Sequence, residues 1–155
     1  DVASSGVITL PTVSSVYEVP LILEEQGLGG LIIETLDLPN IARSMDDWEI
    51  MVEAIKKPKE MITIGVVGKY VDLPDSYISV KEALMHAGLF HERDIEVKWI
   101  RAEDIEREGS SQFLSEMSGI VVPGGFGPRG VQGMIDTVTY ALMSVLHIYN
   151  RFSNE

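Results

Sequence analysis

The sequence has no cysteine and few basic residues. The absence of cysteine from the 155 residues excludes disulfide bonds, thiolate metal ligands and a cysteine nucleophile within this sequence. Only 12 lysines and arginines stand against 24 aspartates and glutamates, which gives a formal net charge of −12. Because nucleic acid phosphates are bound by clustered lysine and arginine, this charge argues against nucleic acid as a partner.

Long hydrophobic runs are also missing. No segment approaches the roughly 20 apolar residues that a membrane-spanning helix needs. The first ten residues, DVASSGVITL, lack the basic start and apolar run of a secretory signal. We therefore expect a cytoplasmic protein without a membrane partner. Hydrophobic residues still make up 45% of the chain, which is enough for a buried core in one domain, or in one small domain with a tail.

The first 60 residues contain short candidate elements separated by glycine and proline. The apolar run Gly6–Leu10 predicts a short strand, and residues 16–26 predict a helix with Pro20 in its first turn. Leu31–Leu36 fits a short helix and a strand equally well. The spacing of Ser44 and Asp47 resembles a capping box, which predicts a further helix before the linker near residue 58.

From residue 61 onward the pattern changes to alternating strands and helices. The run Met61–Gly68 is apolar and β-branched, as in a parallel strand that is buried on both faces. Behind it we expect a helix at 76–88, a strand at 95–99, a short acidic helix or turn at 102–114, a strand at 119–122 and a helix at 131–145. This order predicts an α/β fold with a doubly wound parallel sheet, whose ligands bind in loops after the strands.

The glycine-rich loop Val122–Gly130 (VPGGFGPRG) is the best candidate for chemistry. It lies between a predicted buried strand and a predicted helix, where its backbone N–H groups can turn toward a ligand. Such a loop serves as a phosphate cradle, as an oxyanion hole for acyl transfer, or equally as a tight turn without a ligand. It matches neither the Walker loop nor the spaced dinucleotide fingerprint.

Other polar residues give weaker signals. Lys69 follows a predicted strand and has two interpretations, an anion contact or a solvated loop lysine, of which we favour the second. Asp72 and Asp75 are candidates to cap the next helix. The three histidines, His86, His91 and His147, lack metal-ligand spacing, so we expect no metal site in this chain. The acidic clusters, including Glu103, Asp104 and Glu106, are interpreted as solvated helix faces.

The sequence resembles the CTP synthase family in three blocks that occur in the family's order. These are residues 14–28 (SSVYEVPLILEEQGL), 64–84 (IGVVGKYVDLPDSYISVKEAL) and 122–135 (VPGGFGPRGVQGMI). The resemblance implies that residues 1–45 end an amidoligase domain and that 46–60 form a linker helix. It further implies that residues 61–155 are the incomplete N-terminal part of a glutamine amidotransferase domain.

The resemblance also implies an activity and its ligands. In the family, glutamine is hydrolysed by a Cys-His-Glu triad, and the ammonia aminates UTP to CTP with ATP and Mg²⁺, under activation by GTP. By matching positions, Gly124, Gly125 and Phe126 would shape an oxyanion hole, with Gly125 binding glutamine. Pro11, Thr12 and Val13 would contact ATP, and Arg129 and Gly130 would lie in the GTP-effector region. The full enzyme is expected to be a homo-oligomer, from dimer to tetramer.

The sequence departs from the family after the glycine loop. Residues 139–155 (TYALMSVLHIYNRFSNE) stand where the family has a strand and an elbow carrying the nucleophilic cysteine. We therefore expect an inactive piece of a CTP synthase, with a sheet cut after three strands and incomplete cover over Ile64, Val66 and Val121. Two alternatives remain open: a non-catalytic binding or regulatory module, and a structural piece that docks onto full-length enzyme.

Overall fold

A computed structural model describes residues 4–42, 44–73, 75–144 and 148–150, with the backbone alone at residues 5 and 148–150. The chain divides into two compact units, unit 1 (Asp1–Lys57) and unit 2 (Pro58–Glu155). The identity of these units as domains of a synthase stays a prediction, and each unit is described by itself below.

Unit 1 is built from short helices. They are η1 (Ser4–Gly6), η2 (Val16–Glu18), α1 (Val19–Glu25), α2 (Leu28–Thr35) and α3 (Asp46–Lys56). The predicted strand at Gly6–Leu10 is wrong, because no strand of the described part of unit 1 pairs with it. Instead, the backbone N–H of Thr9 donates to the Gln26 side-chain oxygen over 2.7 Å, and the Gln26 amide donates to the Thr9 carbonyl. The undecided run Leu31–Leu36 lies mostly in α2.

Polar contacts fix the ends of these helices. Ser15 and Glu18 form a capping box at η2, which the sequence analysis did not identify. The box predicted for α3 does not form, since Ser44 only accepts a bond from the Asp46 N–H and the N-cap residue is Met45. The indole of Trp48 donates to the Tyr17 carbonyl over 2.7 Å, which ties α3 to η2.

Unit 2 contains a parallel sheet. Its strands are β1 (Glu60–Gly68), β2 (Arg93–Arg101), β3 (Gly119–Val122) and β4 (Ile148–Asn150), in the order β2-β1-β3-β4. All three strand pairs are parallel, and β1 lies in the interior between β2 and β3. The predicted α/β fold is confirmed, but the expected end of the sheet after three strands is wrong, because β4 pairs with β3.

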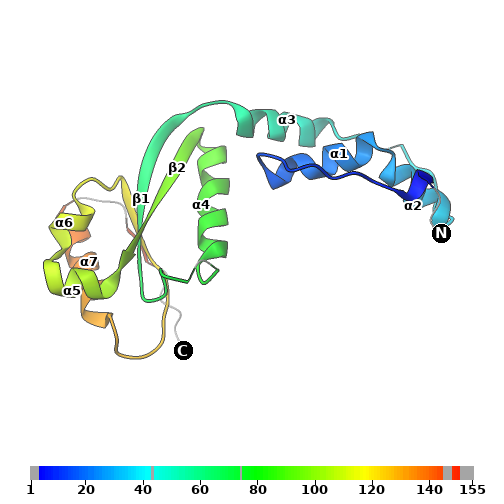
Figure 1. Ribbon diagram of the computed structural model, residues 1–155. Coiled ribbons are helices and arrows are strands. Elements are labelled where there is room, and N and C mark those ends of the chain that lie inside the picture. The colour runs from blue at the N-terminus through cyan, green and yellow to red at the C-terminus, as the bar shows by residue number, and fades with distance from the viewer. Residues whose placement is uncertain (1–3, 43, 74, 145–147, 151–155) are drawn as a thin grey trace. The chain divides into compact units, whose positions relative to one another are not determined.

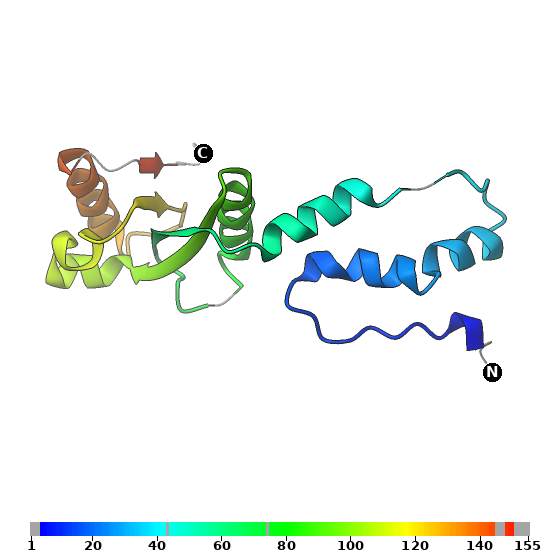
Figure 2. The ribbon, with the colours of Figure 1, turned by 90° about the horizontal axis from the view of Figure 1, so that it is seen from above.

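Helices cover both faces of this sheet (Figures 1 and 2). Helix α4 (Ile78–Phe90) lies on one face, and α5 (Ala102–Glu108), α6 (Ser110–Leu114) and α7 (Val131–Met143) lie on the other. The predicted acidic segment at 102–114 thus forms two helices, separated by Gly109. None of the described helices has the length and apolar character that crossing a membrane requires.

The core of unit 2 lies between the sheet and the α5–α7 layer. Its buried members come from strands β1 to β3, from helices α5 to α7 and from the turn before β3: Val67, Ile100, Ala102, Ile105, Leu114, Met117, Ile120, Val122 and Ala141. Helices α5 and α7 pack closely because Gly133 has no side chain: a Cβ built there would overlap the Ala102 carbonyl oxygen. On the opposite face Val66 is fully buried, so the expectation that it lacks cover is wrong, while Ile64 and Val121 are half-buried.

Candidate functional site

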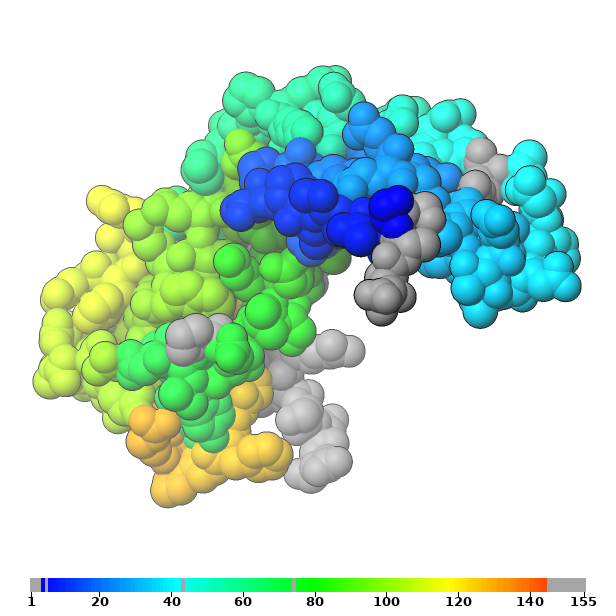
Figure 3. All heavy atoms as spheres, turned by 45° about the vertical axis from the view of Figure 1, so that its right-hand side comes forward, coloured from blue at the N-terminus to red at the C-terminus, as the bar shows by residue number. Residues whose placement is uncertain are grey.

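Two loops of unit 2 meet at the carboxyl edge of the sheet. One begins at Lys69 after β1, and the other covers residues 123–130 after β3. Because β1 and β3 are adjacent and parallel, both loops leave the same edge, which is the usual ligand side of such sheets. Figure 3 shows the 123–130 segment, coloured yellow to orange, at the surface beside the green segment that follows β1.

Lys69 lies beneath the glycine loop. The residue is only 5% exposed, and its ammonium donates hydrogen bonds to the carbonyl oxygens of Phe126, over 3.3 Å, and Gly127. The favoured interpretation of Lys69 as a solvated loop lysine is therefore wrong. A buried ammonium needs several partners to offset its lost hydration, and here backbone carbonyls provide them.

The glycine loop itself faces solvent. Gly124, Gly125 and Gly127 are exposed, and the Phe126 side chain is 85% exposed. Gly127 has a φ of 78°, a left-handed conformation that glycine adopts without strain. A Cβ added to Gly125 would lie 3.1 Å from Cδ of Lys69, so the lysine stem packs directly against this glycine.

Arg129 connects the end of the glycine loop to α5 and to the loop after β1. Its guanidinium donates to the Lys69 carbonyl over 2.7 Å and forms a 2.8 Å ion pair with Glu103 of α5. It also lies over the ring of Tyr70, 5.8 Å from the ring centre. The proposed effector residue is thus held by partners from α5 and from the loop after β1.

Carboxylates of α5 lie at the start of α7. The Gly133 N–H, in the first turn of α7, donates to Glu106 over 3.1 Å. A Cβ on neighbouring Gly130 would lie 3.3 Å from a Glu103 oxygen. The Glu106 carboxylate therefore takes a place that a bound phosphate would have at the helix N-terminus, and both carboxylates are more than a solvated face. Between the two chemistries considered for the loop, this arrangement disfavours the phosphate cradle.

Other predicted residues lie elsewhere. Asp72 pairs with Arg101 over 2.8 Å, and α4 begins after Tyr77 with no side-chain cap, so neither Asp72 nor Asp75 caps this helix. Pro11, Thr12 and Val13 lie in unit 1 in an irregular segment, the first two exposed and Val13 half-buried. Their role toward ATP stays a prediction. His147 lies outside the described residues.

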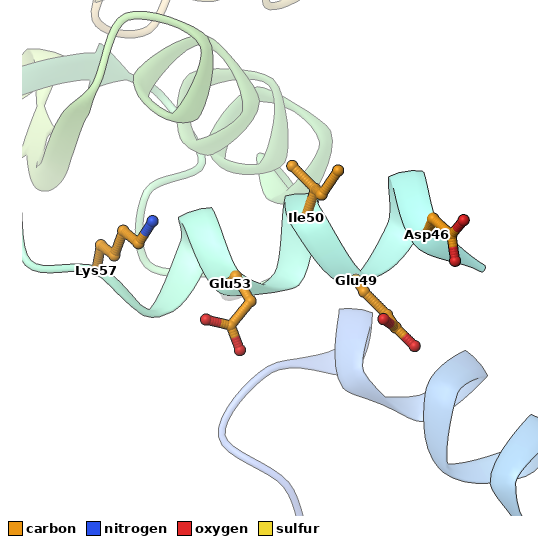
Figure 4. A pocket seen from close by; sticks show the side chains of 5 residues that line it. All are labelled: Asp46, Glu49, Ile50, Glu53 and Lys57. Atoms are coloured by element: carbon orange, nitrogen blue, oxygen red, sulfur yellow. The ribbon is translucent and has the colours of Figure 1, made fainter.

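Two further features of the described residues do not add a site. Within the described residues, no group of three or more histidine, aspartate or glutamate side chains is arranged to hold a metal ion. Figure 4 shows a hollow on unit 1 whose five lining residues, Asp46, Glu49, Ile50, Glu53 and Lys57, all come from α3 and its end. Three carboxylates along one helix do not form a site for an anionic ligand.

The hydrogen bonds and the ion pair around the glycine loop were not predicted from the sequence. A usable signal was present, because a parallel pairing of Met61–Gly68 with 119–122 brings their carboxyl ends together. A lysine directly after the first strand then lies under the loop that follows the second. The contacts of Arg129 with Glu103 and Tyr70 depend on how α5 packs on α7, and no short motif encodes that packing.

A family model and several known proteins are similar to this chain, and they agree with one another. Residues 72–148 match the family model described as glutamine amidotransferase class-I. A CTP synthase of Chloroflexus aurantiacus is 50% identical over 141 residues, 91% of this chain and 26% of that protein. A CTP synthase of Dehalococcoides mccartyi is 48% identical with the same coverage. The chain therefore spans about a quarter of the length of the curated relatives it matches.

A solved structure resembles unit 2 in fold. It is the glutaminase domain of Trypanosoma brucei CTPS with bound acivicin, with a TM-score of 0.53 and 29% identity over 57% of this chain and 35% of that chain. The parallel sheet, its glycine loop and the family match together give unit 2 a fold like that of class I glutamine amidotransferases. The predicted resemblance to the CTP synthase family is confirmed.

Proposed function

We propose that this chain is part of an enzyme that aminates UTP to CTP, using ATP and ammonia released from glutamine. The observation that carries the proposal is the 50% identity to a CTP synthase across 91% of the chain, from unit 1 through the glycine loop. Because the chain spans only about a quarter of that relative, the complete reaction is proposed for the whole enzyme.

The glycine loop is the part of that reaction we assign to unit 2. Hydrolysis of the glutamine amide passes through a tetrahedral intermediate whose oxygen carries negative charge. Gly124, Gly125 and Phe126 are exposed residues whose backbone N–H groups are proposed to bind this oxygen, and Gly125 is proposed to contact glutamine. The start of α7, where Glu106 of α5 already accepts from the Gly133 N–H, supports this function over phosphate binding.

The nucleophile must come from outside this sequence. Class I amidotransferases of this kind attack glutamine with a cysteine thiolate, and the chain contains none. We therefore propose that the 155-residue chain does not hydrolyse glutamine by itself. A carbonyl bound at the loop would meet donors for its oxygen but no group to attack its carbon.

The remaining ligands are assigned to the whole enzyme. Pro11, Thr12 and Val13 are proposed to contact ATP through their backbone, and Arg129 and Gly130 to lie in the region that responds to GTP. Mg²⁺ has no matching group of ligands among the described residues, so its chemistry is not assigned to them. A cytoplasmic location and a homo-oligomer of two to four subunits are proposed for the enzyme as well.

Ammonia release and ligand binding test this proposal. The chain is incubated with glutamine, and free ammonia is measured against a buffer control. No release above the control is expected, and steady release would overturn the assignment of the nucleophile. Titration with L-glutamine, monitored through the amide signals of Gly124 and Gly125, should shift these signals, whereas D-glutamine serves as the matched control. The absence of any shift would count against the loop as the glutamine site.

A further inference from the structure

The loops after β1 and β3 hold each other through a reciprocal pair of contacts. The Lys69 side chain donates to the carbonyls of Phe126 and Gly127 in the glycine loop. In return, the Arg129 side chain, from the end of that loop, donates to the carbonyl of Lys69 itself. Each loop thus supplies a cation that binds the backbone of the other. We call these contacts the loop brace.

The two halves of the brace differ in burial. Lys69 is 5% exposed, and within the described part of the chain its ammonium meets carbonyl oxygens in place of a carboxylate. The Arg129 side chain is 60% exposed and already shares its charge with Glu103. Hydrogen bonds from a buried charged group contribute more than an exposed ion pair, so the geometry of the loop depends chiefly on Lys69.

When a hydrogen bond fixes a carbonyl oxygen, it also fixes the N–H of the same peptide unit, which points in the opposite direction. The peptide is planar and trans, so the N–H of Gly127 points away from Lys69 when the Phe126 oxygen points toward it. The lysine stem also packs against Gly125, where it limits the rotation of the preceding peptide units.

We propose that Lys69 is a positioning residue for glutamine hydrolysis, because its buried ammonium and stem set the backbone orientation of Gly124–Phe126. The proposal rests on the function proposed above for this loop. Lys69 touches neither the substrate nor the reacting atoms in this role. It acts through the loop, whose N–H groups must point outward together if they are to bind one oxygen atom.

A methionine at position 69 is the direct test. The Lys69→Met variant keeps a similar stem and removes the donors, and Lys98→Met, at an exposed lysine of β2, is the matched control. In ¹⁵N-labelled chain, Lys69→Met should shift or broaden the amide signals of Gly124, Gly125 and Gly127, whereas Lys98→Met should leave them in place. Unchanged loop signals in a folded Lys69→Met variant would overturn the proposal.

A second variant covers the case in which Lys69→Met does not fold. Gly125→Ala adds a methyl group 3.1 Å from the lysine Cδ, at an exposed position where the fold itself tolerates it. If the lysine couples these residues, this change moves the amide signal of Gly127, two residues away. A signal of Gly127 that stays in place would then overturn the proposal.

A measurement of glutamine binding distinguishes a failure of this inference from a failure of the proposed function. Where the wild-type chain binds L-glutamine, Lys69→Met should weaken binding by about tenfold, the factor that corresponds to the loss of one well-placed hydrogen bond to the ligand. The Lys69→Arg variant should restore part of it by renewing the donors. Equal affinity in wild type and Lys69→Met would overturn the positioning role. A wild-type chain that ignores glutamine would instead contradict the proposed glutamine site, while the loop signals still decide whether the brace exists.

Discussion

Units 1 and 2 hold their elements together by different means. Of the twelve hydrophobic residues that are buried in the described chain, eleven lie in unit 2 and only Val52 lies in unit 1. Unit 1 relies on individual polar contacts, such as the indole of Trp48 on the Tyr17 carbonyl and the ion pair of Lys56 with Glu18. Unit 2 should therefore respond to changes in packing, and unit 1 to changes in hydrogen bonds and pH.

The two tryptophans allow the units to be observed separately. The chain contains only two, Trp48 in α3 of unit 1 and Trp99 in β2 of unit 2. Replacing either one with phenylalanine leaves a single tryptophan, in the other unit, whose fluorescence can be excited selectively. Differences between the units can thus be measured in one intact chain, without separating them.

The largest effect is expected from Gly133→Ala in unit 2. A methyl group at this position overlaps the Ala102 carbonyl oxygen, so α5 and α7 must separate. We expect a loss of about 3 kcal/mol in the free energy of unfolding, at the upper end for overpacked sites. Urea unfolding followed by Trp99 fluorescence in a Trp48→Phe background measures it, with Gln132→Ala on the same helix as the control. An unchanged midpoint would mean that packing does not dominate unit 2.

A single hydrogen bond should matter in unit 1. Trp48→Phe keeps an aromatic ring beside Tyr17, whose centre lies 6.3 Å from that of Trp48, but removes the donor to the Tyr17 carbonyl. We expect unit 1 to lose about 1 kcal/mol, the net value of such a bond. Faster amide hydrogen exchange in α3 would report this loss. Trp99→Phe is the control, and equal exchange in both variants would argue that unit 1 does not depend on this contact.

The same comparison explains what the sequence predicted well. Strand β1 and helix α7 carry strong signals, because the buried run Met61–Gly68 and the apolar spacing from Val131 onward are properties of the segments themselves. Both belong to unit 2, where burial decides the structure. The glycine loop was identified in the same way, from its position between a strand and a helix.

Predictions failed where a distant side chain decides the local structure. Gly6–Leu10 has the composition of a strand, yet its backbone is bound by Gln26, 17 residues further along. Lys69 has the composition of a solvated loop residue, yet the folding of β3 beside β1 brings carbonyls to it. Long-range contacts of this kind leave no local pattern in the sequence. They account for most of the differences, both in unit 1 and at the candidate site.

A glycine in unit 1 should respond in the opposite way from Gly133. Gly30 lies inside α2, is exposed, and would have no atom within 4 Å of an added Cβ. Gly30→Ala should therefore stabilise unit 1 by about 0.5–1 kcal/mol, because alanine loses less backbone entropy in a helix. Slower amide exchange in α2 would demonstrate the gain. A loss of stability would reveal packing around α2 comparable to that in unit 2.

The smallest effect is expected from the pH dependence that Glu18 gives to unit 1. Bonds from Lys56 and Ser14 lower the pKa of Glu18 from 4.5 to about 2. Since this pKa is lower in the folded chain, the ionised carboxylate stabilises unit 1 above about pH 4.5, and the contribution is lost as the pH falls toward 2. In a Trp99→Phe background, Trp48 fluorescence should change over this range, and Glu18→Gln should remove that change.

Glu96, whose pKa is lowered by Lys98 on β2, provides the matched test in the other unit. Glu96→Gln should leave the Trp48 profile as it is, because the ion pairs of unit 2 lie on the surface of a packed core. A Trp48 profile that follows Glu96 instead of Glu18 would show that the two units do not respond to pH separately.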